Sequence, residues 1–312
     1  MVDTQEYALV YHWWNNTPNV KPYQDLSNPV ILAIATARAY NPKITIYVID
    51  ISFIERPLED WGDFPKTLSF TIIPRKILMN CGLPNCNPLC SRVWDVWDAC
   101  QKDIPKNNIL FTDADVFWLK DMFPLEMSNQ GKLNYFHCHK NNTGVWYFDK
   151  RSPFVKEVFC IWKGIMALAM VDNAFHEEIK TLLPSAREGF FQEEIAFSYL
   201  LLTYPRYYHS LSIRENFLVY ELRHRTPEEL SRVKCLHCLR SVMGNQRGRA
   251  CYYLKELSDA IHSTLTSEQM KLIFDDFKPT KVCSIYDIQK MSIDQLIEFT
   301  TMYGCSDIMS LK

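Results

Sequence analysis

Apolar runs alternate with helix-like segments along the first part of the chain. Residues 7–13 and 44–49 are apolar and rich enough in β-branched or aromatic side chains for buried strands, and the alanine-rich residues 29–40 lie between them. This order predicts a βαβ unit. We expect further strands at residues 68–73 and 108–111 and a helix at residues 91–101. Continuous apolar strands between helices indicate an α/β fold, with a mostly parallel sheet flanked by helices on both faces.

The second half of the chain continues this alternation and ends in helices. We expect strands at residues 133–137 and 233–237, a turn and strand within residues 142–149, and helices at residues 154–169 and 193–202. Helix starts with the spacing of capping boxes are Thr226 with Glu229, Thr266 with Gln269, and Ser292 with Gln295. We therefore predict an α/β domain over residues 1–253 and a helical C-terminal extension over residues 254–312 that packs on it.

Two carboxylates stand at the end of the strand expected at residues 108–111. Asp113 and Asp115 are separated by Ala114, and on an extended chain residues two apart point to the same face. Two oxygen anions on one face suit a hard divalent cation of the kind that binds phosphates. An Asp-x-Asp arises by chance about once in a chain this long, so the apolar strand before it gives the pair its weight. The alternative is an Asp-rich turn capped by its own side chains.

Composition and charge exclude several classes of protein. The chain has 312 residues, of which 47% are hydrophobic and 22% charged, and this supports a folded core instead of disorder. A net charge of −2 gives no general attraction to nucleic acid. No apolar run reaches the roughly eighteen residues of a membrane helix, and residues 1–10 lack the basic start and apolar centre of a signal peptide. We expect a cytoplasmic protein without a membrane span or a nucleic-acid partner.

The cysteines do not indicate a disulfide framework. Their number, 11, is odd, and no secretory signal accompanies them, which favours reduced thiols. Cys235 and Cys238 form a tight Cys-x-x-Cys, but no second pair stands at the distance usual for zinc, and the cysteines between residues 81 and 100 are unevenly spaced. Structural zinc is therefore the less favoured interpretation of these residues.

The arrangement around the Asp pair resembles a known family, the metal-dependent nucleotide-sugar glycosyltransferases of the GT-A fold, whose hallmark is an Asp-x-Asp at the end of a strand. The arginine-bearing segment Ser91-Arg92-Val93-Trp94, followed by the strand that ends in Asp113-Ala114-Asp115, is similar to the glycogenin-like branch. Asn142-Thr143-Gly144 resembles the Asn-x-Gly turn that lies near the sugar in these enzymes. The resemblance covers residues 7–249.

The resemblance implies a divalent metal and a nucleoside-diphosphate sugar. Asp113 and Asp115 would be ligands of Mn²⁺ or Mg²⁺, with His237 as a third ligand. The family's histidine is usually followed by a phosphate loop rich in Gly and Lys, whereas here residues 239–248 stand in its place. For His237, a core imidazole on a strand is the alternative.

Chemistry independent of the resemblance agrees with a metal. Breaking a sugar–phosphate bond places negative charge on the departing diphosphate, and a divalent cation stabilises it without proton transfer. With nine glycines and no Gly-rich phosphate loop, the chain needs arginines for the diphosphate. Guanidinium groups bind phosphate oxygens in a bidentate fork. Arg92 is the first candidate and Arg240, Arg247 and Arg249 are the next, with a solvated surface arginine as the alternative for each.

Two acids open the helix expected at residues 193–202. Glu193 and Glu194 follow a Gly-Phe-Phe turn that can deliver them to a ligand. One of them would orient an acceptor hydroxyl or serve as general base in an inverting displacement. The alternative is that they are first-turn acids that complement the helix dipole.

Other polar and aromatic residues complete the expected site. At the carboxyl ends of strands, where ligands settle in such sheets, Asn15, Asn16 and Asp50 would line the nucleotide. The sugar would lie against Asn142, Thr143 and Gly144. Candidates for stacking on a base or sugar are Trp13, Trp14 and Trp146, whereas core packing is expected for Trp94, Trp97 and Trp162.

These observations predict a cytoplasmic glycosyltransferase of the hexosyltransferase type. It would move a sugar from a nucleoside-diphosphate donor, UDP-linked in our expectation, to a glycan or other hydroxyl acceptor with Mn²⁺ or Mg²⁺. Within enzymes, a nucleotidyltransferase or phosphohydrolase with the same metal clamp is the alternative. From another class, a noncatalytic carbohydrate-binding or scaffold protein on this fold is possible.

Overall fold

The computed structural model describes residues 6–15, 19–52, 57–76, 91–123, 136–139, 142–181, 193–211, 217–218, 225–237, 254–274, 282–292 and 294–295. Its strands are β1 (Tyr7–Trp14), β2 (Thr45–Ser52), β3 (Phe70–Lys76), β4 (Asn108–Asp113), β5 (Val116–Trp118), β6 (Phe136–His139), β7 (Asn142–Asp149), β8 (Tyr208–Ser210), β9 (Phe217–Leu218) and β10 (Cys235–His237). Its α-helices are α1 (Val30–Tyr40), α2 (Phe64–Thr67), α3 (Arg92–Lys102), α4 (Pro153–Val171), α5 (Asn173–Lys180), α6 (Glu193–Thr203), α7 (Pro227–Leu230), α10 (Lys255–Thr264), α11 (Ser267–Phe274) and α12 (Ile285–Lys290). Short 3-10 helices are η2 (Pro22–Gln24), η3 (Leu58–Trp61) and η5 (Pro205–Tyr207).

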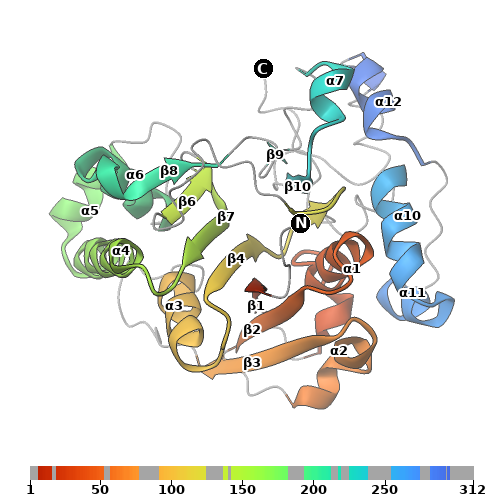
Figure 1. Cartoon of the computed structure of the whole chain (residues 1–312), viewed down its shortest axis with the longest axis horizontal. Coiled ribbons are helices and arrows are strands. Elements are labelled where there is room, and N and C mark those ends of the chain that lie inside the picture. Colours follow the sequence, from red (N-terminus) through yellow and green to blue (C-terminus); the bar gives the residue numbers. More distant parts are fainter. Residues whose placement is uncertain are drawn as a thin grey trace.

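A seven-stranded sheet in the order β3-β2-β1-β4-β7-β6-β8 forms the centre of the molecule, with helices on both faces (Figure 1). Strands β1, β2, β3 and β4 pair in parallel, β7 runs antiparallel to β4 and β6, and β8 is parallel to β6. The predicted βαβ unit is β1-α1-β2. The prediction of an α/β fold with a mostly parallel sheet is confirmed.

A second, smaller sheet lies beyond the end of β4. After Asp113 the chain turns at Ala114 and Asp115, and β5 pairs antiparallel with β10, which pairs in parallel with β9. The strand predicted at residues 233–237 is β10. Because β4 and β5 are almost continuous in sequence but belong to different sheets, the turn between them is where the two sheets meet.

The core consists of one apolar layer on each face of the main sheet. In β1, Leu9, Tyr11 and Trp13 belong to the layer under α1, whereas Ala8 and Val10 belong to the layer under α3, α4 and α6. All five side chains are fully buried. This alternation follows from the two-residue period of a strand, and burial on both faces explains why the central strands are continuously apolar.

The C-terminal helices contribute to the layer under α1. Helix α10 lies beside α1 (Figure 1), and Leu257 and Ile261 of α10 are in the same core cluster as Ile34. The boundary predicted at residue 253 stays a prediction. The capping-box contacts are present at Thr226, Thr266 and Ser292.

Most of the predicted elements differ from the observed ones at their ends; the strand expected at residues 68–73, for example, is β3 (Phe70–Lys76). The strand expected at residues 133–137 begins at Phe136 as β6, and residues 124–135 lie outside the described part of the chain. The helix expected at residues 154–169 is α4, which reaches Val171. In the described part of the chain, none of the helices combines the length and the apolar character needed to cross a bilayer.

One arginine fixes the end of α1 to the main sheet. The guanidinium of Arg38, in the last turn of α1, donates hydrogen bonds at 2.7 to 2.9 Å to the backbone oxygens of Pro42, Ile44, Leu68 and Ser69. These oxygens belong to the connections that lead into β2 and β3. The side chain therefore ties the α1 crossover to the edge of the sheet.

We expect Arg38→Ala to lower the free energy of unfolding by about 3 kcal/mol, because several carbonyls lose a charge-assisted hydrogen bond at once. Arg38→Lys should lose about half as much stability. A single ammonium, unlike the forked guanidinium, cannot reach all of these carbonyls, which lie in different directions. Urea denaturation measures both, and Arg151→Ala, at an exposed arginine, is the control. A loss below about 1 kcal/mol in Arg38→Ala would show that water satisfies these carbonyls equally well.

Candidate functional site

The turn between β4 and β5 delivers the two aspartates of the Asp-x-Asp. Asp113 is the last residue of β4, and Asp115 lies in the turn directly before β5. The side chain of Asp113 is 23% exposed and that of Asp115 is 7% exposed. We expected strand alternation to put both carboxylates on one face, but the chain turns between them. It is this turn, with Ala114 packed into the core, that brings the two carboxylates together.

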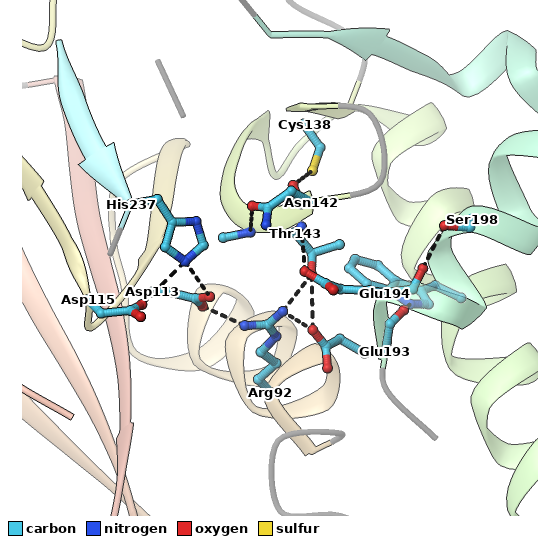
Figure 2. A network of polar contacts seen from close by, with 12 residues as sticks. Arg92, Asp113, Asp115, Cys138, Asn142, Thr143, Glu193, Glu194, Ser198 and His237 are labelled. Carbon is cyan, nitrogen blue, oxygen red and sulfur yellow. Dashed lines mark hydrogen bonds and ion pairs between the residues drawn. The ribbon is translucent and has the colours of Figure 1, made fainter. Parts of the chain in front are cut away.

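The register of β10 against β5 adds a histidine. His237 is paired with Val116, the residue after Asp115. Its Nε2 lies 3.3 Å from Oδ1 of Asp115 and 3.8 Å from Oδ2 of Asp113. Figure 2 shows the imidazole pointing at both carboxylates. One ligand atom from each of these residues, here called the triad, lies within 4.8 Å of the others.

The triad fits a divalent cation. Two carboxylate oxygens and one imidazole nitrogen form a donor set suited to Mn²⁺, and to Mg²⁺ through the oxygens. Burial by itself lowers the pKa of His237, but Asp115, Asp113 and Glu194 together outweigh it, so the pKa is raised above its usual value. An imidazole that faces several carboxylates holds a proton more tightly. A metal ion at this position competes with that proton.

Arg92 joins the triad to a second pair of acids. It is the first residue of α3, in the crossover from β3 to β4, so it stands at the carboxyl edge of the parallel strands. Its guanidinium forms ion pairs with Asp113 and with Glu193, and it donates a hydrogen bond of 2.5 Å to the Thr143 hydroxyl. Figure 2 shows Arg92 between these groups. Among the described residues its Nε is buried and has no hydrogen-bond partner.

Thr143 is the meeting point of the two glutamates. Its hydroxyl lies 3.0 Å from Oε1 of Glu193 and 3.3 Å from Oε1 of Glu194, and its backbone N–H donates to Glu194 at 3.2 Å. Glu193 is 3% exposed and Trp162 donates to its backbone oxygen. Both acids lie in the first turn of α6, as the helix-dipole alternative has it, and each also has a specific polar partner.

The two glutamates differ in their partners. Glu193 pairs with the guanidinium of Arg92, whereas Glu194 accepts hydrogen bonds from the neutral groups of Thr143. Burial raises the pKa of Glu194 above its usual value, and the nearby Arg92 and the Thr143 N–H reduce this shift. A carboxyl with a raised pKa is a stronger base when it is ionised.

The structure describes two of the residues that the sequence suggested for the nucleotide, Asn15 and Asp50. The side-chain amide of Asn15 donates to Asp25 at 2.8 Å, at the carboxyl end of β1. Asp50 is buried and accepts a hydrogen bond of 3.0 Å from Trp61 Nε1. Their roles toward a nucleotide stay predictions. Residues lying outside the described part of the chain are Asn16, Arg240, Arg247 and Arg249.

Two of the expected stacking residues belong to the core. Trp13 and Trp146 are fully buried. Trp13 packs edge-on against Trp61, and Trp146 packs against Phe111 with ring centroids 4.2 Å apart. The stacking role predicted for Trp13 and Trp146 is wrong, because inward positions on central strands are covered by helices on both faces.

The tryptophans that we expected in the core lie there. Trp162 is fully buried, and Trp94 and Trp97 are partly buried against the same core layer, as predicted. Trp14 is partly buried at the end of β1, and its stacking role stays a prediction.

The structure adds a buried pair beside the triad that the sequence did not single out. Asp95, fully buried in α3, has Oδ2 3.3 Å from Nε2 of His12. His12 is the β1 residue in register with Asp113. Two weak signals were present, a histidine inside an apolar strand and an acid one helical turn after Arg92, but neither shows that the two residues meet.

Comparison of the sequence with protein-family models and with curated proteins gives no match. Among solved structures, the galactosyltransferase LgtC, in complex with donor and acceptor sugar analogs, is 13% identical with a TM-score of 0.50, over 85% of this chain and 99% of that chain. The glycosyltransferase GlyE of Streptococcus pneumoniae is 14% identical with a TM-score of 0.49, over 82% of this chain and 63% of that chain. Mouse xyloside xylosyltransferase 1 is 11% identical with a TM-score of 0.46, over 74% of this chain and 97% of that chain.

This chain thus spans less than two thirds of the length of GlyE. At such low identity the likeness to LgtC is a likeness of fold, and it agrees with the sheet order and with the Asp-x-Asp at the end of β4. The chain has the fold of the GT-A glycosyltransferases.

Proposed function

We propose that the chain is a metal-dependent glycosyltransferase that transfers a sugar from a nucleoside-diphosphate donor, UDP-linked in our proposal, to a hydroxyl acceptor. The observation that carries this proposal is the convergence of Asp113, Asp115 and His237 next to Arg92, at the carboxyl edge of a sheet with the GT-A fold. The LgtC structure, by its description, holds donor and acceptor sugar analogs. Its shared fold supports the same class of substrates here.

The triad would hold Mn²⁺ in this proposal, through the carboxylates of Asp113 and Asp115 and through Nε2 of His237. A bound divalent cation supplies a positive charge that stabilises a departing nucleoside diphosphate. The partial burial of the triad keeps water from screening that charge.

Arg92 would bind the diphosphate next to the triad, because its guanidinium is paired with Asp113. Glu193 and Thr143 hold its guanidinium in place, so the donor finds a pre-oriented cation. Glu193 is thus a positioning residue for Arg92.

Glu194 is the proposed partner of the acceptor. It is not paired directly with Arg92 in the way that Glu193 is, and its raised pKa suits a group that accepts the proton of an attacking hydroxyl. Asn142 would contact the sugar, and Asn15, Asn16 and Asp50 the nucleotide. Thr143, which the sequence also suggested for the sugar, is fully buried and would support Arg92 and the glutamates instead.

We expect Asp113→Asn and Asp115→Asn each to lower kcat/KM for metal-dependent release of UDP from a UDP-sugar by about 100-fold or more, because a neutral amide is a poor ligand for a hard cation. Chelation by EDTA should abolish turnover of the unmodified protein, and Mn²⁺ should restore it. Asp259→Asn, at an exposed acid on α10, is the matched control and should leave the rate unchanged. Turnover at the original rate in Asp115→Asn would refute the metal assignment.

The products separate the enzyme classes. From a UDP-sugar, a glycosyltransferase releases UDP, whereas a phosphohydrolase that cleaves the diphosphate releases UMP and a sugar 1-phosphate. A nucleotidyltransferase releases pyrophosphate, but only when it is given UTP and a sugar 1-phosphate. UMP from the first assay, or pyrophosphate from the second, would replace our proposal by another use of the same triad.

Arg92→Lys should raise KM for the donor at least about tenfold, because one ammonium cannot pair with Asp113 and Glu193 together and also present its charge to a phosphate. Arg151→Lys, at an exposed arginine, is the matched control. Steady-state kinetics with donor concentration varied measures the effect. A donor KM within about twofold of the unmodified protein in Arg92→Lys would place the diphosphate elsewhere.

A further inference from the structure

Gly144 lies against the ring of His237. It is the third residue of β7, and because Thr112 of β4 is in register with Val145, Gly144 is the next residue toward Asp113. A Cβ atom built at Gly144 would stand 2.6 Å from Nδ1 of His237, closer still to its Cε1, and 3.0 Å from Oδ1 of Asn142. Contacts this short are not seen between real side chains, so the imidazole occupies the space where any other residue would carry its side chain.

Backbone conformation does not explain this glycine. Among the described residues the glycine with a positive φ is Gly62, at +58°, whereas Gly144 lies in an ordinary strand. An alanine can adopt the Gly144 backbone without strain. The requirement for glycine therefore comes from close neighbours, the His237 ring first and the side-chain oxygen of Asn142 second.

The ring has little room to move away. His237 is 2% exposed, and Asp115 and Asp113 face its Nε2 on the other side. Figure 2 shows the imidazole between these carboxylates and the segment of Asn142 and Thr143. Displacing the ring from β7 thus changes its position relative to both carboxylates of the triad.

We infer that Gly144 is a positioning residue of the metal site, whose missing side chain lets His237 reach Asp113 and Asp115. This inference rests on the proposed metal-dependent function. It assigns Gly144 a role in the seat of the metal, in place of the sugar contact that the resemblance implied. The main sheet then helps to position His237 as well as the aspartates, because β7 limits how closely the smaller sheet can approach.

Binding of Mn²⁺ alone, without a sugar donor, tests the inference. We expect Gly144→Ala to weaken Mn²⁺ affinity, measured by calorimetry or by the electron paramagnetic resonance signal of free Mn²⁺, by about 10- to 100-fold, as disturbed supporting contacts of a metal ligand do. Gly164→Ala is the matched control, since a Cβ at Gly164 on α4 meets nothing within 4 Å. It should bind Mn²⁺ as the unmodified protein does.

A double variant separates positioning from a general structural effect. His237→Ala removes the ring, so adding Gly144→Ala to it should change neither Mn²⁺ affinity nor Tm in EDTA any further. If Gly144→Ala by itself does not fold, the double variant must still fold with the Tm of His237→Ala. A further loss in the double variant would show that Gly144 acts through another contact and would overturn the inference.

The remaining outcomes distinguish this inference from the proposed function. Unchanged Mn²⁺ affinity in Gly144→Ala, together with a large loss in His237→Ala, overturns the role of Gly144 and leaves the triad intact. Equal Mn²⁺ affinity of His237→Ala and the unmodified protein overturns the triad, and the role of Gly144 with it.

Discussion

Among the described residues at the carboxyl edge of the main sheet, carboxylates outnumber the cationic side chains that face them. The guanidinium of Arg92 pairs with Asp113 and Glu193 and lies near Glu194, whereas Asp115 faces His237. Partly buried carboxylates without a counter-charge are costly. The raised pKa of His237 shows how the protein responds to this imbalance, and the triad is where a divalent cation would relieve it.

Arg92 holds together elements that are far apart in the sequence. Through one side chain, α3 is connected to the end of β4, to β7 and to α6. The guanidinium also lies 5.5 Å from the ring centroid of Trp146, so the polar site rests directly on the aromatic core layer. The contacts of Arg92 therefore stabilise this part of the fold and also fix the geometry of the site.

The two sheets have separate parts in building the triad. The main sheet carries the chain to Asp113, and the departure of β5 into the smaller sheet lets β10 place His237 opposite Val116. The contact between Gly144 and the imidazole then fixes how closely the sheets approach. A metal site at such a junction depends on the relative placement of two sheets, and small side chains at the junction are part of its construction.

The sequence by itself determined the α/β fold, the mostly parallel sheet, the capping boxes and the position of the Asp pair, because periodicity, capping and strand ends are local patterns. It also singled out Arg92 and His237, through their spacing within a recognisable family arrangement. Tertiary structure alone decided that Thr143 joins the two glutamates, that His12 meets Asp95, and that Trp13 and Trp146 are buried. It also decided that a turn, and not strand alternation, brings Asp113 and Asp115 together. These outcomes depend on register and on packing between elements distant along the chain, and residue order carries no direct record of either.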